Sequence, residues 1–247
     1  MKKSLAYAGG ALLLLPLLLT AINIAQNGTS TPDGRDAETI LGVEQGEATV
    51  EHVRRLSKAD LMQLFYALDA PEPGELDGEY DAVLIDVGVL SAGSAWYTHH
   101  IFGDGRWLGK GFRAARNGRA SPSKAQNSVT ATTKADTYGD TRGDGYNLFA
   151  GSGAGGARGG SEVQRLRKFD TYPGPSRIAA GDSFHLDYHA YNGGTVHSMR
   201  DEIRKINNNL YLGMGHMALG GGAINPAPFM LLGPAKGPAR ESVDGPE

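Results

Sequence analysis

The chain has 247 residues, with 24 Lys and Arg against 27 Asp and Glu, a formal net charge of -3 and no Cys. This near balance argues against a protein that binds duplex nucleic acid, and the lack of Cys excludes disulfides, thiolate metal sites and a Cys nucleophile. Glycine, at 36 residues, is about twice as frequent as the roughly 7% usual in proteins. That excess favours turns and strand connections over long helices.

The first 25 residues are typical of a targeting or anchoring segment. Two lysines precede an uncharged stretch, residues 4–25, with a Leu-rich centre. The pattern fits a signal peptide, but the stretch is also long enough to cross a bilayer as one helix. Because Leu19 and Asn23 fit the -3 position of a cleavage site poorly, we favour an uncleaved signal anchor over a cleaved signal peptide. The positive-inside bias then predicts a single-pass membrane protein with an extracytoplasmic C-terminal domain, or a secreted or periplasmic protein if the leader is cleaved.

A polar linker and a short helix follow this leader. Residues 26–50 are polar and are predicted to form a flexible linker. Ser57 suits a helix N-cap, and apolar residues then recur at i, i+3, i+4 and i+7 from Leu61 to Leu68. We therefore predict one short amphipathic helix at the start of a globular domain that spans residues 51–235.

Beyond the helix, the hydrophobic pattern changes to that of strands. The predicted strands cover residues 80–87, 107–112, 163–172, 184–191, 199–206, 210–217 and 228–232. Asn207 to Asn209 separate two of these runs and predict a hairpin, because Asn tolerates the left-handed conformation of tight turns. The remaining segments are a long polar loop (113–145), a Gly-rich loop (150–160) and a polar tail (236–247). Short strands at short spacing predict a mainly β domain, an antiparallel sheet curled into a small barrel or a sandwich, and we favour the barrel.

One motif resembles a known family. Gly105-Arg106-Trp107-Leu108-Gly109-Lys110 matches a G-x-W-x-G-K pattern, which resembles the GXWXG protein family. Further pieces similar to that family and to the C-terminal sheet often joined to it are Ala67–Pro71, Leu76–Tyr80, Tyr172–Pro175, Arg200–Glu202 and Leu210–Gly213. The resemblance covers residues 57–232 in scattered pieces, and it implies a small calycin-like β-barrel with no particular chemistry.

The motif also supplies candidate ligand-binding residues. From the residues alone, Trp107 would fill the barrel with its indole, as plain core or as a ligand contact. Lys110 would cover that ring with its aliphatic stem or pair with an acidic group of a ligand. We nominate Trp107, Lys110, Tyr188 and Tyr191 as ligand-binding residues.

A His-x-Asp-x-His pattern supplies the candidate catalytic residues. His185, Asp187 and His189 alternate along a predicted strand, so their side chains would project from one face about 6.6 Å apart. Two imidazoles and a carboxylate suit acid–base catalysis near neutral pH, and they also form a ligand set for zinc or non-haem iron. Because the spacing is wide for three ligands of one ion, we favour a solvated face or a hydrogen-bonded lumen, and we expect no metal and no cofactor.

These observations lead to three functional hypotheses. The first is a membrane-tethered or exported barrel that binds a small apolar or amphipathic molecule such as a lipid. It contacts the membrane through residues 4–25 and binds no nucleic acid. The alternative is a barrel enzyme, either a lyase, an isomerase or a metal-dependent enzyme, that uses the face of His185, Asp187 and His189. The further alternative is a structural protein of the envelope. The mixed charges of residues 200–205 predict a salt-bridged surface.

Overall fold

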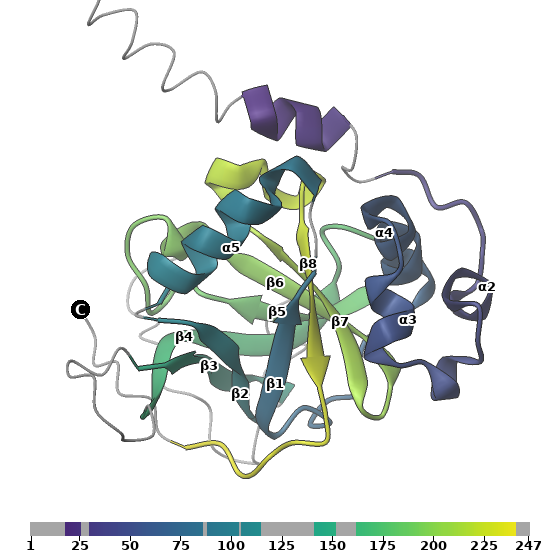
Figure 1. Cartoon of the computed structure of the whole chain (residues 1–247). Coiled ribbons are helices and arrows are strands. Elements are labelled where there is room, and N and C mark those ends of the chain that lie inside the picture. The colour runs from purple at the N-terminus through teal and green to yellow at the C-terminus, as the bar shows by residue number, and fades with distance from the viewer. Residues whose placement is uncertain are drawn as a thin grey trace, which may run out of the picture.

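The eight strands form one closed antiparallel barrel (Figure 1). The computed structural model describes residues 18–25, 30–85, 88–103, 105–114, 141–151 and 162–240. The strands are β1 (Gly78–Leu84), β2 (Trp107–Arg113), β3 (Gly143–Ala150), β4 (Val163–Pro175), β5 (Asp182–Asp187), β6 (Arg200–Asn207), β7 (Leu210–His216) and β8 (Ala227–Leu232). Each strand pairs with its sequence neighbours, and β8 closes the barrel against β1. The predicted small antiparallel barrel is confirmed, and so is the β6–β7 hairpin.

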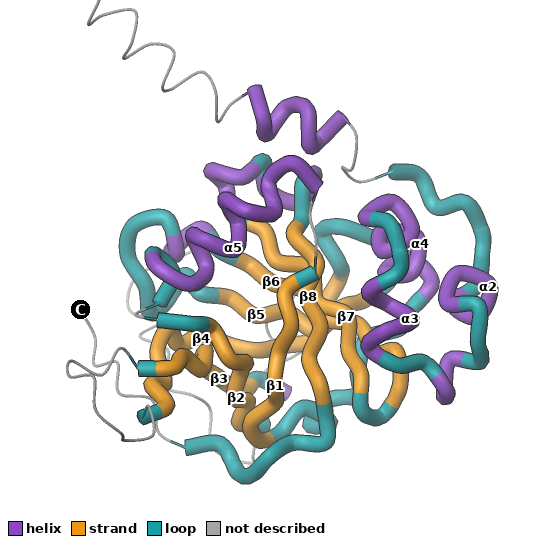
Figure 2. Tube along the Cα trace, in the orientation of Figure 1, coloured by secondary structure: helices purple, strands orange, loops and turns teal. Residues whose placement is uncertain are grey.

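Helices cover one side and one end of this barrel (Figure 2). They are α2 (Ala37–Leu41), α3 (Val50–Arg54), α4 (Lys58–Ala67) and α5 (Ser91–His100), with short 3-10 turns that include η1 (Gln45–Glu47), η2 (Gly88–Leu90), η5 (Ala218–Gly220) and η6 (Gly222–Ile224). Residues 18–25 are also helical. The helices α2 to α4 lie beside the barrel, whereas α5 lies across one of its ends, together with the turns η5 and η6.

The predicted amphipathic helix is α4, and side chains satisfy its backbone at both ends. The Ser57 hydroxyl accepts a hydrogen bond from the amide of Asp60 at 3.1 Å, as expected of an N-cap. At the other end, the buried guanidinium of Arg204 donates to the carbonyls of Phe65 and Leu68 at 2.9 and 2.8 Å. Helix ends leave carbonyls without intrahelical partners. Because Arg204 belongs to β6 and supplies donors to these carbonyls, its hydrogen bonds connect the end of α4 to the barrel.

A first group of apolar residues, here called the outer cluster, lies between α2–α4 and the outside of the barrel. It consists largely of aliphatic side chains. Its members are Ala37, Ile40, Leu41, Ala48, Val53, Leu61, Met62, Leu64, Phe65, Leu68, Ile85, Ile178, Ile206, Leu210, Leu212, Met214 and Met230. Burial of these side chains holds the helices against strands β6, β7 and β8.

A second group, the lumen cluster, fills much of the barrel interior and is rich in aromatic rings. Its members are Leu76, Tyr80, Phe102, Trp107, Phe112, Phe149, Phe169, Phe184, Leu186, Tyr188, Val196, Ile203, Tyr211, Phe229 and Leu231. Glycines on the strands make room for this packing. A Cβ atom at Gly213 would overlap the ring of Phe229, and one at Gly109 would overlap the carbonyl oxygen of Tyr80. The second glycine of the G-x-W-x-G motif therefore lets β1 and β2 approach closely.

The structure corrects the expected linker and tail. Within residues 26–50, helix α2 buries Ile40 and Leu41 in the outer cluster, because a few apolar residues can dock on a neighbouring helix even within a polar segment. Part of the expected tail runs along β1, where the amide of Lys236 donates to the carbonyl of Glu79 at 2.7 Å.

Several other boundaries differ from the prediction or lie outside the described residues. Helix α5 and strand β3 were not predicted, and β3 begins within the expected loop 113–145. Most of that loop, most of the loop 150–160 and the leader up to residue 17 lie outside the described residues. Among the residues that the structure describes, no helix has both the length and the apolar character needed to cross a membrane.

Candidate functional site

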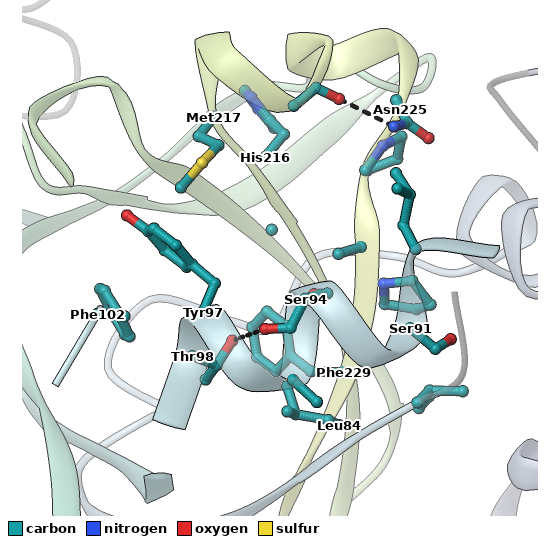
Figure 3. Close-up of a pocket in the computed structure, with 18 of the residues that line it drawn as sticks. Leu84, Ser91, Ser94, Tyr97, Thr98, Phe102, His216, Met217, Asn225 and Phe229 are labelled. Atoms are coloured by element: carbon teal, nitrogen blue, oxygen red, sulfur yellow. Dashed lines mark hydrogen bonds between the residues drawn. The ribbon is translucent and has the colours of Figure 1, made fainter. Parts of the chain in front are cut away.

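A cavity of about 480 Å³ lies at the end of the barrel that α5 covers (Figure 3). Ser94 and Tyr97 of α5 face it from one side, and His216 and Met217 at the end of β7 face it from the other. Apolar side chains make up most of the wall: Leu84, Ile85, Leu90, Ala95, Phe102, Trp107, Met199, Met217, Ala227 and Phe229. Lys110 and Asp201 are the charged groups on the lumen side of this wall.

Lys110 and Asp201 form an ion pair inside the barrel. The Lys110 Nζ lies 2.8 Å from Asp201 Oδ2, and each side chain is only 2% exposed. Lys110 also donates to the hydroxyl of Tyr188 at 2.7 Å and to Asn147 Oδ1 at 2.9 Å. An ammonium has three N–H donors, so these three acceptors use all of them.

Tyr188 and Asn147 complete the network around that ion pair. The Tyr188 hydroxyl donates to Asp201 Oδ2 at 2.9 Å and accepts from Asn147 Nδ2 at 3.1 Å. Asn147 Nδ2 also donates to the carbonyl of Arg167, and its Oδ1 accepts from the indole of Trp107 at 3.0 Å. These shared hydrogen bonds hold each side chain of the network in one orientation.

Burial and charge shape the titration of this network. Burial lowers the pKa of the Lys110 ammonium, and the neighbouring Asp201 carboxylate opposes that shift. Burial also raises the pKa of the Tyr188 hydroxyl well above its usual value, and the Asp201 charge acts in the same direction. Four aromatic rings surround the ammonium with centroids 5.1–5.4 Å from Nζ, those of Trp107, Phe169, Tyr188 and Phe229. Their negative faces favour the cation.

Polar groups also line the outer part of the cavity. Asn225 Oδ1 accepts from Lys58 Nζ at 3.0 Å and from Asn23 Nδ2 at 2.7 Å, which connects residues 18–25 to α4. Burial lowers the pKa of Lys58 to about 8. His216 has no partner for its buried Nε2 among the described residues, and burial lowers its pKa.

The four nominated ligand-binding residues occupy three different environments. Trp107 and Lys110 line the cavity. Tyr188 is fully buried next to them and belongs to the polar network. Tyr191 lies away from the cavity, where its hydroxyl donates to Asp170 Oδ1 at 2.9 Å. The motif residues are therefore next to the cavity, whereas Tyr191 has a separate partner.

The candidate catalytic residues do not form a common site. Strand β5 ends at Asp187, so His189 does not continue the alternation that the sequence predicts. His185 Nε2 is within 3.1 Å of the carbonyls of Gly174 and Pro175. Asp187 pairs with Arg200 at 3.1 Å, and the ring of His189 lies 3.8 Å from that of His197. No group of three potential metal ligands occurs among the described residues.

The sequence interpretation missed Asp201 and Asn147. Residues 200–205 were expected at a salt-bridged surface, but Asp201, Glu202 and Arg204 are buried. The strand has two buried faces, because α4 covers the side opposite the lumen. One signal in the sequence could have located Asp201. Residues two apart on a strand share a face, so Asp201 lies on the same face as the apolar Ile203 and could have been assigned to the barrel interior.

No family model, curated protein or solved structure matches this chain. The resemblance to the GXWXG family therefore stays a prediction from the motif. The closed eight-stranded barrel is compatible with that prediction.

Proposed function

We propose that this protein binds a small apolar or amphipathic molecule, such as a lipid, in the cavity beneath α5. The observation that carries the proposal is the combination of a mainly apolar wall with a compact polar group at one place on it, the pair of Lys110 and Asp201. A cavity of about 480 Å³ falls within the range of ~300–1,000 Å³ that is usual for small-molecule sites. An eight-stranded barrel is large enough to hold one small ligand.

Exposed apolar residues around the cavity support a membrane as the source of that ligand. Val89, Trp96, Ile101, Leu219 and Ile224 are large apolar residues at the surface. Each is next in sequence to a residue that lines the cavity. Exposed apolar side chains next to a cavity are favoured where a surface contacts a membrane or a partner.

The N-terminal segment fits the same proposal. Residues 4–25 form the apolar stretch that we interpret as a signal anchor or signal peptide, and the helix at 18–25 contacts the cavity rim through the bond from Asn23 to Asn225. We propose a barrel tethered by, or exported with, this segment, and related in fold to the GXWXG family. A tether at the rim would keep the cavity close to the bilayer.

A displacement assay with the full-length protein tests the binding proposal. A fluorescent probe with an apolar chain should bind the wild-type protein and should be displaced by extracted membrane lipids. Ala95 lines the cavity, so Ala95→Trp places an indole in the binding space and should weaken probe binding at least tenfold.

The matched control is Ala92→Trp on the same helix. Ala92 is exposed and does not belong to the cavity wall, so this variant should bind the probe like the wild type. Equal binding by both variants, or no binding by the wild type, would contradict the proposed site. Circular dichroism spectra of the two variants check that both are folded.

The enzyme hypothesis based on His185, Asp187 and His189 has no support from geometry, because the side chains of these three residues do not contact one another. The His185 ring is next to the carbonyl of Gly174, Asp187 pairs with Arg200 and accepts from the backbone amide of His189, and the His189 ring lies against that of His197. The structural-protein hypothesis needs an interior filled by the protein's own side chains. The lumen cluster satisfies that condition for part of the barrel, whereas the cavity beneath α5 favours binding.

A further inference from the structure

The polar network in the lumen leaves one oxygen without a hydrogen-bond donor. Lys110, Tyr188 and Asn147 direct all their donors to acceptors within the protein. Asp201 Oδ2 accepts from Lys110 and Tyr188. Asp201 Oδ1 has no partner among the described residues, although Asp201 is only 1% exposed. Buried polar atoms usually have partners, so an unused carboxylate oxygen needs an explanation.

The residue that carries this oxygen belongs to the cavity wall. Asp201 and Gly215 both line the cavity and are opposite each other on strands β6 and β7. A Cβ atom built on Gly215 would lie 2.9 Å from Asp201 Oδ1. The glycine therefore keeps the space beside this carboxylate oxygen free of side-chain atoms at the cavity wall.

We infer that the cavity recognises a neutral hydroxyl group at the end of an apolar chain, which enters head first and donates its hydrogen to Asp201 Oδ1. This inference rests on the proposed binding function and adds the chemical class of the ligand. A carboxylate or phosphate offers no hydrogen to this oxygen and is repelled by its charge. An ammonium group is also disfavoured, because the Lys110 ammonium already compensates the charge of Asp201 and would repel a second cation.

Three ligands with the same ten-carbon chain test the inference in the displacement assay with the full-length protein. 1-Decanol offers a donor, decyl methyl ether offers none, and decanoate carries a negative charge. We expect 1-decanol to displace the probe at a concentration at least tenfold lower than either of the other two, which corresponds to about 1.4 kcal/mol. Decylammonium, as a fourth ligand, should also be weaker than 1-decanol.

Two glycine variants locate the interaction without removing a charge. Gly215→Ala puts a methyl group against Asp201 Oδ1 and should reduce the preference for 1-decanol over the ether to less than threefold. Gly193→Ala is the control, because Gly193 does not belong to the cavity wall and a Cβ atom there meets no atom within 4 Å. That variant should keep the preference of the wild type.

The outcomes separate this inference from the proposed function. If the probe binds but decanoate, decylammonium or the ether displaces it as well as 1-decanol does, the hydroxyl inference is wrong and the binding function stands. Preference for 1-decanol that persists in Gly215→Ala would also overturn it, because the donor would then be bound elsewhere. If the wild type binds neither the probe nor any of the four ligands, both proposals fail.

Discussion

The outer cluster and the lumen cluster lie on opposite faces of the same strands and differ in composition. The outer cluster holds mainly Leu, Ile, Met and Val, and it is covered by α2–α4. The lumen cluster is mostly aromatic and surrounds the ion pair of Lys110 and Asp201. Aliphatic side chains pack densely without polar requirements, whereas a buried ion pair needs partners for every group. The outer cluster therefore has the composition of a stabilising core, and the lumen combines aromatic packing with the buried charges of the candidate site.

If the two clusters have these different roles, single substitutions should affect the free energy of unfolding and the ligand affinity separately. A substitution in the outer cluster, except at Ile85, which also lines the cavity, should lower the free energy of unfolding and leave the ligand affinity of the folded protein unchanged. A substitution in the lumen network should change both quantities. Four substitutions, at Lys110, Leu61, Lys58 and Ser57, test this division and have progressively smaller expected effects.

Removal of the buried cation should have the largest effect. Lys110→Met leaves the Asp201 carboxylate inside the barrel without its charged partner, and the loss of one member of a buried pair typically costs about 3–5 kcal/mol. Urea unfolding measures this change. Lys236→Met is the control, because the Lys236 side chain is 66% exposed in its pair with Asp81 and should cost less than about 1 kcal/mol. Equal effects of the two substitutions would mean that water reaches the lumen pair.

Truncation within the outer cluster should come second. Leu61 is fully buried on α4, and Leu61→Ala should lower the free energy of unfolding by about 2–5 kcal/mol. Leu219→Ala makes the same chemical change at a side chain that is 71% exposed, and it should fall within about 0.5 kcal/mol of the wild type. Probe affinity measured for folded Leu61→Ala should match the wild type, and a weaker affinity would show that the two clusters are coupled.

The charge of Lys58, which lies on α4 at the cavity rim, should have a smaller effect. Its pKa is lowered from 10.5 to about 8 by burial, so between these pH values the unfolded chain binds more protons than the folded protein. Stability should therefore rise with pH across this window, by at most about 3 kcal/mol. The measurement is the difference in unfolding free energy between wild type and Lys58→Met from pH 7 to 10.5. A difference that does not grow with pH would place the Lys58 amine in contact with water.

Loss of the α4 cap should have the smallest effect. Ser57→Ala removes the acceptor for the Asp60 amide and should cost about 1 kcal/mol. Ser57→Thr keeps a hydroxyl that can accept from the Asp60 amide and donate to the Asp60 carboxylate, and it should recover most of the loss. Thermal unfolding of both variants checks the prediction, together with probe affinity, which should stay at the wild-type value. Full stability of Ser57→Ala would mean that packing alone defines where α4 begins.

Much of the fold could be predicted from the sequence, because alternating apolar residues and Asn-rich or Gly-rich breaks specify strands and turns. The helix α4 and the β6–β7 hairpin follow from such patterns. Helix α5, by contrast, contains Gly93, two serines and two histidines, and its position depends on the barrel end that it covers. No local pattern predicts a helix of this kind.

The candidate site was less predictable than the fold. Trp107 and Lys110 were found through a short motif, and they do line the cavity. Their partners Asn147 and Asp201 come from strands 37 and 91 residues away from Lys110, and only the closure of the barrel brings them together. The chain order carries no sign of such long-range pairings. For His185, Asp187 and His189 the predicted alternation on one strand face was wrong for a simpler reason, because the strand ends at Asp187.

The junction between β1 and β8 joins the first and last strands of the barrel, whereas every other junction joins consecutive strands. Loop-closure entropy makes this seam the most costly contact to form, since about 150 residues separate its two sides. The cavity lies along the seam: Leu84 and Ile85 contribute to its wall from one side, and Ala227 and Phe229 from the other. A bound molecule would therefore contact both sides of the seam, and its binding free energy would stabilise the closed form of the barrel against separation of β1 from β8.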